Sequence, residues 1–146
     1  MLHFLNTLLY ILQKYLNLLG ADYIFTVDSN FNETIHSRGR ENFKYESFSR
    51  GEQSRIDLAI LFSWRDIISK VNGREVTALF LDEVFDSSTD TEGVENIMNV
   101  LRSLENVNVF SISHRDHDPE NFDSVIRVNK VGRFSTYERT YTLDNC

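Results

Sequence analysis

Two adjacent acids, Asp82 and Glu83, follow a short apolar run at residues 76–81, and this position suits them for catalysis. A run of this length is typical of a strand in a parallel sheet, and ligands bind beyond the carboxyl ends of such strands. There an aspartate can hold Mg²⁺, and an adjacent glutamate, which points elsewhere, can orient and deprotonate a water. The simpler alternative is a strand that runs into an acidic turn, because further polar residues follow: Asp86, Ser87, Ser88 and Asp90.

A histidine, His114, comes about 30 residues later, after a second apolar run at residues 107–112. At the edge of a sheet its ring can hydrogen-bond a terminal phosphate. The same loop also permits a metal-dependent phosphohydrolase, whose ligands would be His114, His117, Asp118 and Asp82. Short loops rarely present so many groups to one ion, and a solvated polar loop is a third interpretation.

Ser49 and Glu52 have the spacing of a capping box at the start of a long helix. The free N–H groups of a helix start also attract anions, and the helix macrodipole adds to this attraction. Gly51 leaves the backbone open to close approach and Arg50 supplies a cation, so a phosphate is a suitable ligand. Taken alone, the motif is better explained by capping without any ligand.

Hydrophobic periodicity predicts the elements that must position these residues. Leucines spaced by three and four residues predict a helix over residues 1–19, which either packs on the domain or continues a coiled coil. Strand, helix and strand at residues 76–81, 91–104 and 107–112 form a βαβ unit, which implies a parallel pair buried on both faces. The other expected elements are strands at 21–27, 31–37, 124–129 and 132–143, a polar loop at 37–42, and a helix at 49–71 that ends at 72–74.

Composition favours one packed domain, because the chain has 146 residues, a single proline and 12% aromatic side chains. The only cysteine, Cys146, can form no disulfide within the chain, and no signal-peptide pattern is visible, so a reducing, cytoplasmic setting is expected. No apolar stretch approaches the ~20 residues of a membrane span, so no membrane contact is expected. The net charge of −7 argues against a wholly basic nucleic-acid-binding surface, but it is compatible with a local patch or with DNA contacts made through another subunit.

The sequence contains no Gly-x-x-x-x-Gly-Lys-Ser/Thr motif, so it has no phosphate-cradling loop of its own. Its motifs come in a fixed order: a polar helix start, a strand ending in acids and a strand ending in histidine. This order resembles the signature motif, Walker B strand and H-loop of ABC-type ATPase heads. Residues 45–52, 55–59 and 81–88 are similar to the large subunits of T-even-type phage recombination exonucleases, which are SMC-like repair ATPases that partner a metallophosphoesterase nuclease.

The resemblance implies a nucleotide contact at the helix start. In that family the signature residues contact the γ-phosphate of a nucleotide held by the opposing head, and Ser49 and Gly51 occupy those positions. Arg50 and Phe48 depart from the family's usual glycine and leucine. Asp90 is the implied D-loop aspartate, at a spacing one residue longer than the commonest one.

The resemblance also assigns the remaining residues to ATP hydrolysis. Asp82 would be the Walker B acid that helps to hold Mg²⁺, Glu83 the base that activates water, and His114 the switch histidine. The implied assembly is a homodimer of heads driven together by ATP. The phosphate-binding lysine would come from another polypeptide or from a missing N-terminal half, so the chain alone is not expected to be an active ATPase.

The expected fold is therefore α/β: the C-terminal lobe of an ABC-type ATPase head, with a parallel βαβ core, flanking strands and an N-terminal helix. Residues 1–19 would end a coiled coil or pack as a helix, and residues 20–146 would form the lobe. The implied function is that of the ATP-binding and ATP-hydrolysing subunit of an exonuclease complex for recombination and double-strand-break repair, in the cytoplasm of a phage host. The competing interpretation is a degenerate lobe that only dimerises or docks a nuclease.

Overall fold

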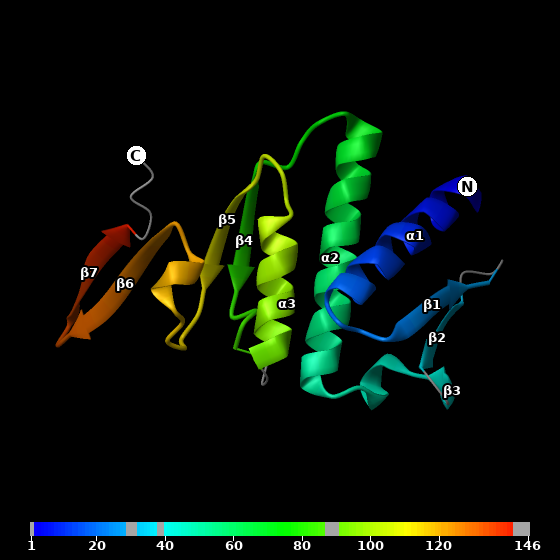
Figure 1. Cartoon of the computed structure of the whole chain (residues 1–146), viewed down its shortest axis with the longest axis horizontal. Helices are drawn as coiled ribbons and strands as arrows, with labels where there is room; N and C mark the ends of the chain where they lie inside the picture. The colour runs from blue at the N-terminus through cyan, green and yellow to red at the C-terminus, as the bar shows by residue number, and fades with distance from the viewer. Residues whose placement is uncertain (1, 29–31, 38–39, 87–90, 142–146) are drawn as a thin grey trace. The chain divides into compact units, whose positions relative to one another are not determined.

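A computed structural model describes residues 2–28, 32–37, 40–86 and 91–141. The chain forms two compact units, Met1–His114 and Arg115–Cys146. The elements of the first unit are, in chain order, α1 (Leu2–Leu18), β1 (Tyr23–Val27), β2 (Glu33–Ser37), β3 (Arg40–Phe43), the 3₁₀ helix η1 (Tyr45–Ser47), α2 (Arg50–Asn72), β4 (Ala78–Asp82), α3 (Thr91–Arg102) and β5 (Asn108–Ile112) (Figure 1). Those of the second unit are the 3₁₀ helix η2 (Pro119–Asn121), β6 (Ser124–Val131) and β7 (Phe134–Tyr141).

The long helix α2 begins and ends where its capping residues predict. Ser49 is the N-cap and forms a complete capping box with Glu52. At the other end Gly73 adopts the left-handed conformation, with φ 61°, which a glycine reaches without steric cost. The predicted helix is confirmed, and its buried side carries Ile56, Leu58, Ala59, Phe62, Ser63 and Ile67.

Three tyrosines attach the preceding elements to α2 through hydroxyl-to-carboxylate hydrogen bonds. The pairs and their oxygen–oxygen distances are Tyr15 to Asp66 at 2.9 Å, Tyr23 to Glu52 at 2.5 Å and Tyr45 to Asp57 at 2.9 Å. Hydrogen bonds to ionised acceptors are stronger than neutral ones, so these pairs fix α1, β1 and η1 against one helix. Leu16 of α1 and Leu19, which follows the helix, contribute to the same core, since both are fully buried.

Strands β1, β2 and β3 form an antiparallel sheet, in which Tyr23 pairs with Ser37 and Val27 with Glu33. The polar segment at residues 37–42 was expected to be a loop, but part of it forms β3, which pairs with β2 through Ile35–Phe43 and Ser37–Arg40. An edge strand needs no alternation of apolar residues, because cross-strand backbone bonds hold it. Hydrophobic patterning therefore does not reveal it.

The predicted parallel pair is present, but its predicted burial on both faces is wrong. Strands β4 and β5 pair in parallel from Ala78–Asn108 to Asp82–Ile112. Leu79 and Leu81 lie on the buried face of β4, whereas Phe80 on the other face is 71% exposed. Its register partner Phe110 is 51% exposed, and the two rings stack with centroids 4.8 Å apart. Both faces of a parallel pair are normally covered, so this face lacks a partner layer within the described residues.

The second unit is a β-hairpin with a regular ladder. Strands β6 and β7 pair antiparallel from Ser124–Tyr141 to Val131–Phe134. A two-residue connection begins at Gly132, whose φ of 65° suits a tight hairpin turn. The residues of β7 are all exposed, including Phe134 and Tyr137. Two strands alone are only marginally stable in water, so this hairpin also presents apolar surface for a further layer.

Candidate functional site

The predicted acidic and histidine residues meet where β4 and β5 end. Because the two strands are parallel, their carboxyl ends lie at one edge, and Asp82 is the register partner of Ile112. The Glu83 backbone N–H donates to the Ile112 carbonyl across 2.8 Å, which ties the two departing loops together. Glu83 adopts a φ of 53°, a left-handed conformation that is uncommon outside glycine, and such strained backbone clusters at functional sites.

The side chains of Glu83 and His114 are within hydrogen-bond distance of each other at this edge. The distance from His114 Nε2 to Glu83 Oε1 is 3.0 Å. Both side chains are open to solvent, with 77% of His114 and 58% of Glu83 exposed. An exposed pair of this kind contributes about 0–1 kcal/mol to stability. Its position is therefore better suited to contacting a ligand than to holding the fold.

Asp86 links the same two loops, a role that its place among the polar residues after the strand does not indicate. Its carboxylate accepts hydrogen bonds from the Ser113 hydroxyl and, across 3.2 Å, from the His114 backbone N–H. Its own backbone N–H donates to the Glu83 carbonyl across 3.1 Å, which closes a tight turn. The available signal was the placement of Asp86 and Ser113 just beyond two strands predicted to be parallel neighbours.

Asp82 is the last residue of β4 and its side chain is exposed. One carboxylate of this kind fits Mg²⁺, which is usually bound by one or two protein carboxylates together with substrate phosphates and water. Within the described ranges, no three His, Cys, Asp or Glu residues are grouped so that they could hold a metal ion. His117 instead lies against the Phe122 ring, and Asp118 caps η2 by accepting from the Glu120 backbone N–H across 3.1 Å.

At the start of α2, the capping box is supported by a residue from β1. The Glu52 carboxylate accepts the Ser49 backbone N–H across 2.8 Å, and the Glu52 backbone N–H donates to Ser49 Oγ across 3.4 Å. The Tyr23 hydroxyl donates to the same carboxylate. The hydrogen bond from Tyr23, followed by those from Ser49, lowers the pKa of Glu52, while burial raises the pKa of Tyr23.

Three of the four predicted nucleotide-binding residues lie together at the start of α2. Ser49 and Arg50 are exposed at the start of α2, beside the half-buried Gly51. Figure 1 shows the start of α2 and the carboxyl ends of β4 and β5 toward the same end of the first unit. Asp90 lies outside the described residues.

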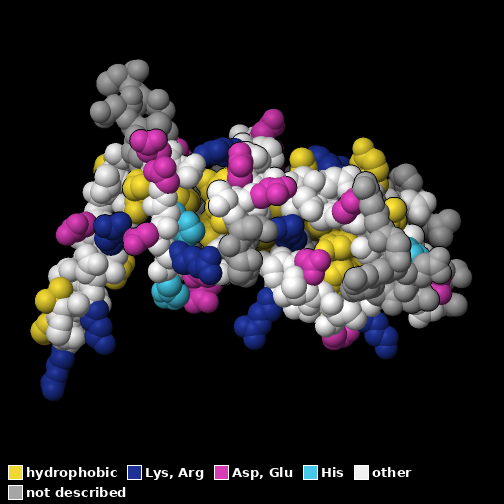
Figure 2. Space-filling view, turned by 60° about the horizontal axis from the view of Figure 1, so that its bottom comes forward, with side chains coloured by type: hydrophobic (Ala, Val, Ile, Leu, Met, Phe, Trp, Pro, Cys, Tyr) yellow, Lys and Arg dark blue, Asp and Glu magenta, His cyan; other side chains and the backbone are white. Residues whose placement is uncertain are grey.

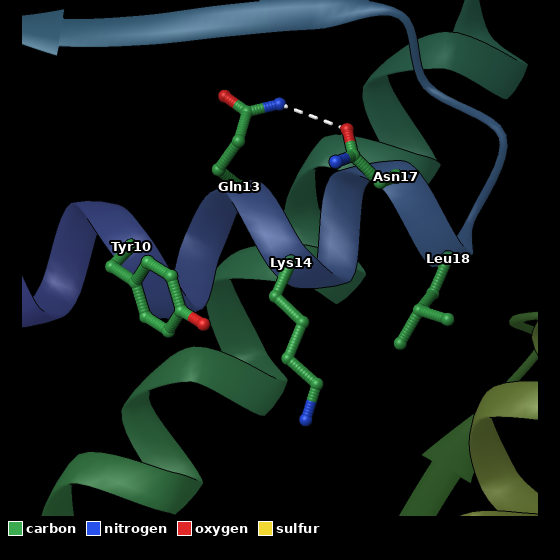
Figure 3. A pocket seen from close by; sticks show the side chains of 5 residues that line it. All are labelled: Tyr10, Gln13, Lys14, Asn17 and Leu18. Atoms are coloured by element: carbon green, nitrogen blue, oxygen red, sulfur yellow. Dashed lines mark hydrogen bonds between the residues drawn. The ribbon is translucent and has the colours of Figure 1, made fainter.

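The described surface also carries a hollow that is lined by other residues. An open hollow of about 430 Å³ lies along α1 and is lined by Tyr10, Gln13, Lys14, Asn17 and Leu18 (Figure 3). It includes none of the candidate site residues described above.

On the face shown in Figure 2, acidic and basic side chains are interspersed and form no broad basic patch. None of the helices described in the structure is sufficiently long and apolar to cross a bilayer.

Comparison with curated proteins gives a clear relationship. No protein-family model matches the chain. The chain is 54% identical over 124 residues to exonuclease subunit 2 of Enterobacteria phage T4, and 53% identical over 124 residues to that of Escherichia phage RB69. Each match covers 85% of this chain and 22% of the relative, so the chain spans about a fifth of the length of these curated relatives.

Comparison with solved structures gives the fold. A chain from a structural study of ATP-driven dimerization and DNA-stimulated activation of SMC ATPases matches with a TM-score of 0.75 at 16% identity, covering 97% of this chain and 88% of that chain. The SMC head domain from Thermotoga maritima gives a TM-score of 0.62 at 22% identity, covering 91% of this chain and 47% of that chain. The expected ABC-type α/β lobe is thereby confirmed. The chain is homologous to exonuclease subunit 2 of phages T4 and RB69, and it has the fold of an SMC ATPase head.

Proposed function

We propose that this chain is the C-terminal lobe of the ATPase head in the large subunit of a phage recombination and repair exonuclease. The observation that carries the proposal is the close contact of the Glu83 and His114 side chains at the shared carboxyl edge of β4 and β5. A base and a phosphate-binding group are thereby within reach of one substrate. The fold shared with a chain from a study of ATP-driven SMC dimerization favours ATP as the phosphate substrate. The name of the relative, exonuclease subunit 2, favours a nuclease as the partner.

In the proposed reaction, ATP loses its γ-phosphate to water. Glu83 accepts the proton of the attacking water, and His114 donates a hydrogen bond to a γ-phosphate oxygen. Asp82 would hold Mg²⁺, which supplies charge neutralisation for the phosphates. Ser49, Arg50 and Gly51 would bind the γ-phosphate of the nucleotide on an opposing head, at the helix start where the macrodipole favours an anion. Asp90 is proposed as a further contact to that nucleotide.

The lobe needs a second lobe to complete this site. The sequence has no phosphate-binding loop, so ATP would have no cradle for its β-phosphate. The stacked rings of Phe80 and Phe110 form an apolar face that no described layer covers. A lobe that carries the phosphate-binding loop and packs on this face would supply both. Two such complete heads would then close on ATP, and the nuclease and DNA would join through the assembled complex.

The uncovered face also favours a second candidate function. A lobe whose only role is to dimerise or to dock a nuclease would equally expose Phe80 and Phe110. The two functions differ in whether the Glu83 carboxylate is needed for turnover. Glu83→Gln preserves the shape of the side chain and its hydrogen bonding but removes the proton acceptor.

The deciding experiment is reconstitution with a lobe that carries a phosphate-binding loop. We expect Mg²⁺-dependent ATP hydrolysis by the mixture and none above background by residues 1–146 alone. Glu83→Gln should reduce turnover at least ~100-fold while ATP-dependent association persists. The matched control is Glu75→Gln, which changes an exposed glutamate ahead of β4 and should leave turnover intact. Equal turnover in Glu83→Gln, or micromolar ATP affinity of the chain alone in calorimetry, would contradict the proposal.

A further inference from the structure

We propose that Asp86 is a positioning residue, which locks Ser113 and His114 onto the Glu83 turn and so sets the distance between the Glu83 and His114 side chains. The inference rests on the proposed function for the use of His114 in hydrolysis. The linkage of the two loops by Asp86 is a property of the isolated chain and does not depend on ATP.

The contacts of Asp86 join the two loops through one carboxylate. One oxygen accepts the Ser113 hydroxyl, and the other accepts the His114 backbone N–H at 3.2 Å. The Asp86 backbone is itself held to Glu83 by the bond from its N–H to the Glu83 carbonyl at 3.1 Å. Asp86 therefore contacts the backbone of both Glu83 and His114. Hydrogen bonds to an ionised carboxylate are about twice as strong as neutral ones, so this link is stiff.

The contact between the Glu83 and His114 side chains needs such support, because the pair alone does not hold its geometry. Both side chains are largely exposed, and an exposed pair gains little from its own attraction. Its 3.0 Å separation must therefore be set by the backbone beneath it. The left-handed φ of Glu83 also indicates that neighbouring contacts hold this backbone in place, because a strained conformation persists only where the surrounding structure enforces it. The contacts that do so here are those of Asp86 and the bond from Glu83 N–H to the Ile112 carbonyl.

The neighbouring residue explains how Asp86 is itself held. Phe85 is 1% exposed and anchors the middle of the turn in the core. Asp86 is thus presented from a fixed backbone toward the loop that follows β5. The buried Phe85 thus fixes the position of Asp86, and Asp86 in turn fixes Ser113 and His114.

The first test uses amide hydrogen exchange in residues 1–146 without nucleotide. Asp86→Asn keeps the size of the side chain but replaces one acceptor oxygen with a donor. We expect the His114 amide to exchange about tenfold faster, because it loses a hydrogen bond to a charged acceptor. Asp57→Asn is the matched control, since Asp57 also accepts a hydroxyl hydrogen bond, from Tyr45, on another part of the unit. Unchanged exchange at His114 in a folded Asp86→Asn chain would overturn the inference.

A milder variant keeps the test decisive if Asp86→Asn does not fold. Ser113→Ala removes only the hydroxyl bond to Asp86 and leaves the backbone bond in place. We expect the His114 amide to exchange about threefold faster in this variant. No acceleration in Ser113→Ala would then refute the role of Asp86.

The second test uses the reconstituted complex and asks whether Asp86 acts through His114. Asp86→Asn should lower kcat about tenfold with KM for ATP changed less than about twofold, because positioning is lost in the chemical step. In a His114→Ala background the same substitution should cost nothing further, since residues that act as a unit are not additive. A full additional tenfold loss would show that Asp86 works independently. If the wild-type complex hydrolyses no ATP, the proposed function fails while the exchange experiment still decides the role of Asp86.

Discussion

The Tyr23 hydroxyl donates to the Glu52 carboxylate across 2.5 Å, and this bond connects β1 to the first turn of α2. The same carboxylate accepts the backbone N–H of Ser49, so one side chain serves both the capping box and the sheet. Tyr23 is held in turn by its ring, which meets Phe48 edge to face with centroids 4.7 Å apart. The orientation of the α2 start, where nucleotide contact is proposed, therefore depends on a residue 29 positions away.

Tyr23→Phe should destabilise the chain and change its response to acid. The lowered pKa of Glu52 means that its stabilising contribution is present above the ordinary value of 4.5 and is lost as pH falls through the folded-state value. Without the hydroxyl, the pKa of Glu52 should rise toward 4.5 and less stability should be lost on acidification. Urea unfolding at pH 7 and at about pH 3 measures both effects. Equal acid sensitivity in the two proteins would remove Tyr23 from the linkage.

Substitutions of Ser49 should separate helix capping from nucleotide contact. Asn and Asp cap helices as well as Ser does, whereas Ala costs about 1 kcal/mol. Ser49→Asn should therefore keep the melting temperature, and Ser49→Ala should lower it by about 3 °C.

Ser49→Asp places a charge where the γ-phosphate of the opposing head is proposed, so ATP-driven engagement in the reconstituted complex should fail. Size-exclusion chromatography with ATP, beside thermal melts, compares the variants. Normal engagement by Ser49→Asp would leave Ser49 as a cap alone.

The sequence predicted the features that depend on local chemistry. The capping box of Ser49 and Glu52 requires only four neighbouring residues, and the helix end requires only Gly73. The parallel pair followed from strand, helix and strand spacing, and it brought Glu83 and His114 to one edge without any knowledge of contacts.

The features that the sequence did not predict depend on what lies beside an element. Strand β3 is polar, so only its pairing with β2 identifies it. The sequence around Asp86 does not distinguish it from other acids in turns. Its role depends on the loop after β5, where Ser113 and His114 donate hydrogen bonds to it. The exposure of Phe80 was also hidden, because an apolar run looks the same whether its second face is covered or awaits a partner.

Two neighbouring residues of β4 should differ in what their substitution impairs: one the stability of the isolated chain, the other its association with a second lobe. Leu81 is 2% exposed, so Leu81→Ala should destabilise the isolated chain by about 2–4 kcal/mol. Phe80→Ser should change the stability of the isolated chain by less than about 1 kcal/mol, because the ring is already in water. It should nevertheless prevent association with the lobe that carries the phosphate-binding loop. Urea unfolding and a pull-down with that lobe give the two readouts. Normal association of Phe80→Ser would mean that this face is not the contact between lobes.

Glu83→Gly should make the chain more stable and the complex inactive. Glu83 adopts a φ of 53°, and a left-handed conformation costs a side-chain-bearing residue roughly 1–2 kcal/mol that glycine avoids. The greater freedom of glycine in the unfolded chain offsets part of this gain, so we expect a net increase of about 0.5 kcal/mol in the free energy of unfolding. Glu83→Ala removes the same carboxylate but keeps the strain, and it should show no such increase. If urea unfolding finds Glu83→Gly no more stable than Glu83→Ala, the left-handed backbone at Glu83 is not a source of strain.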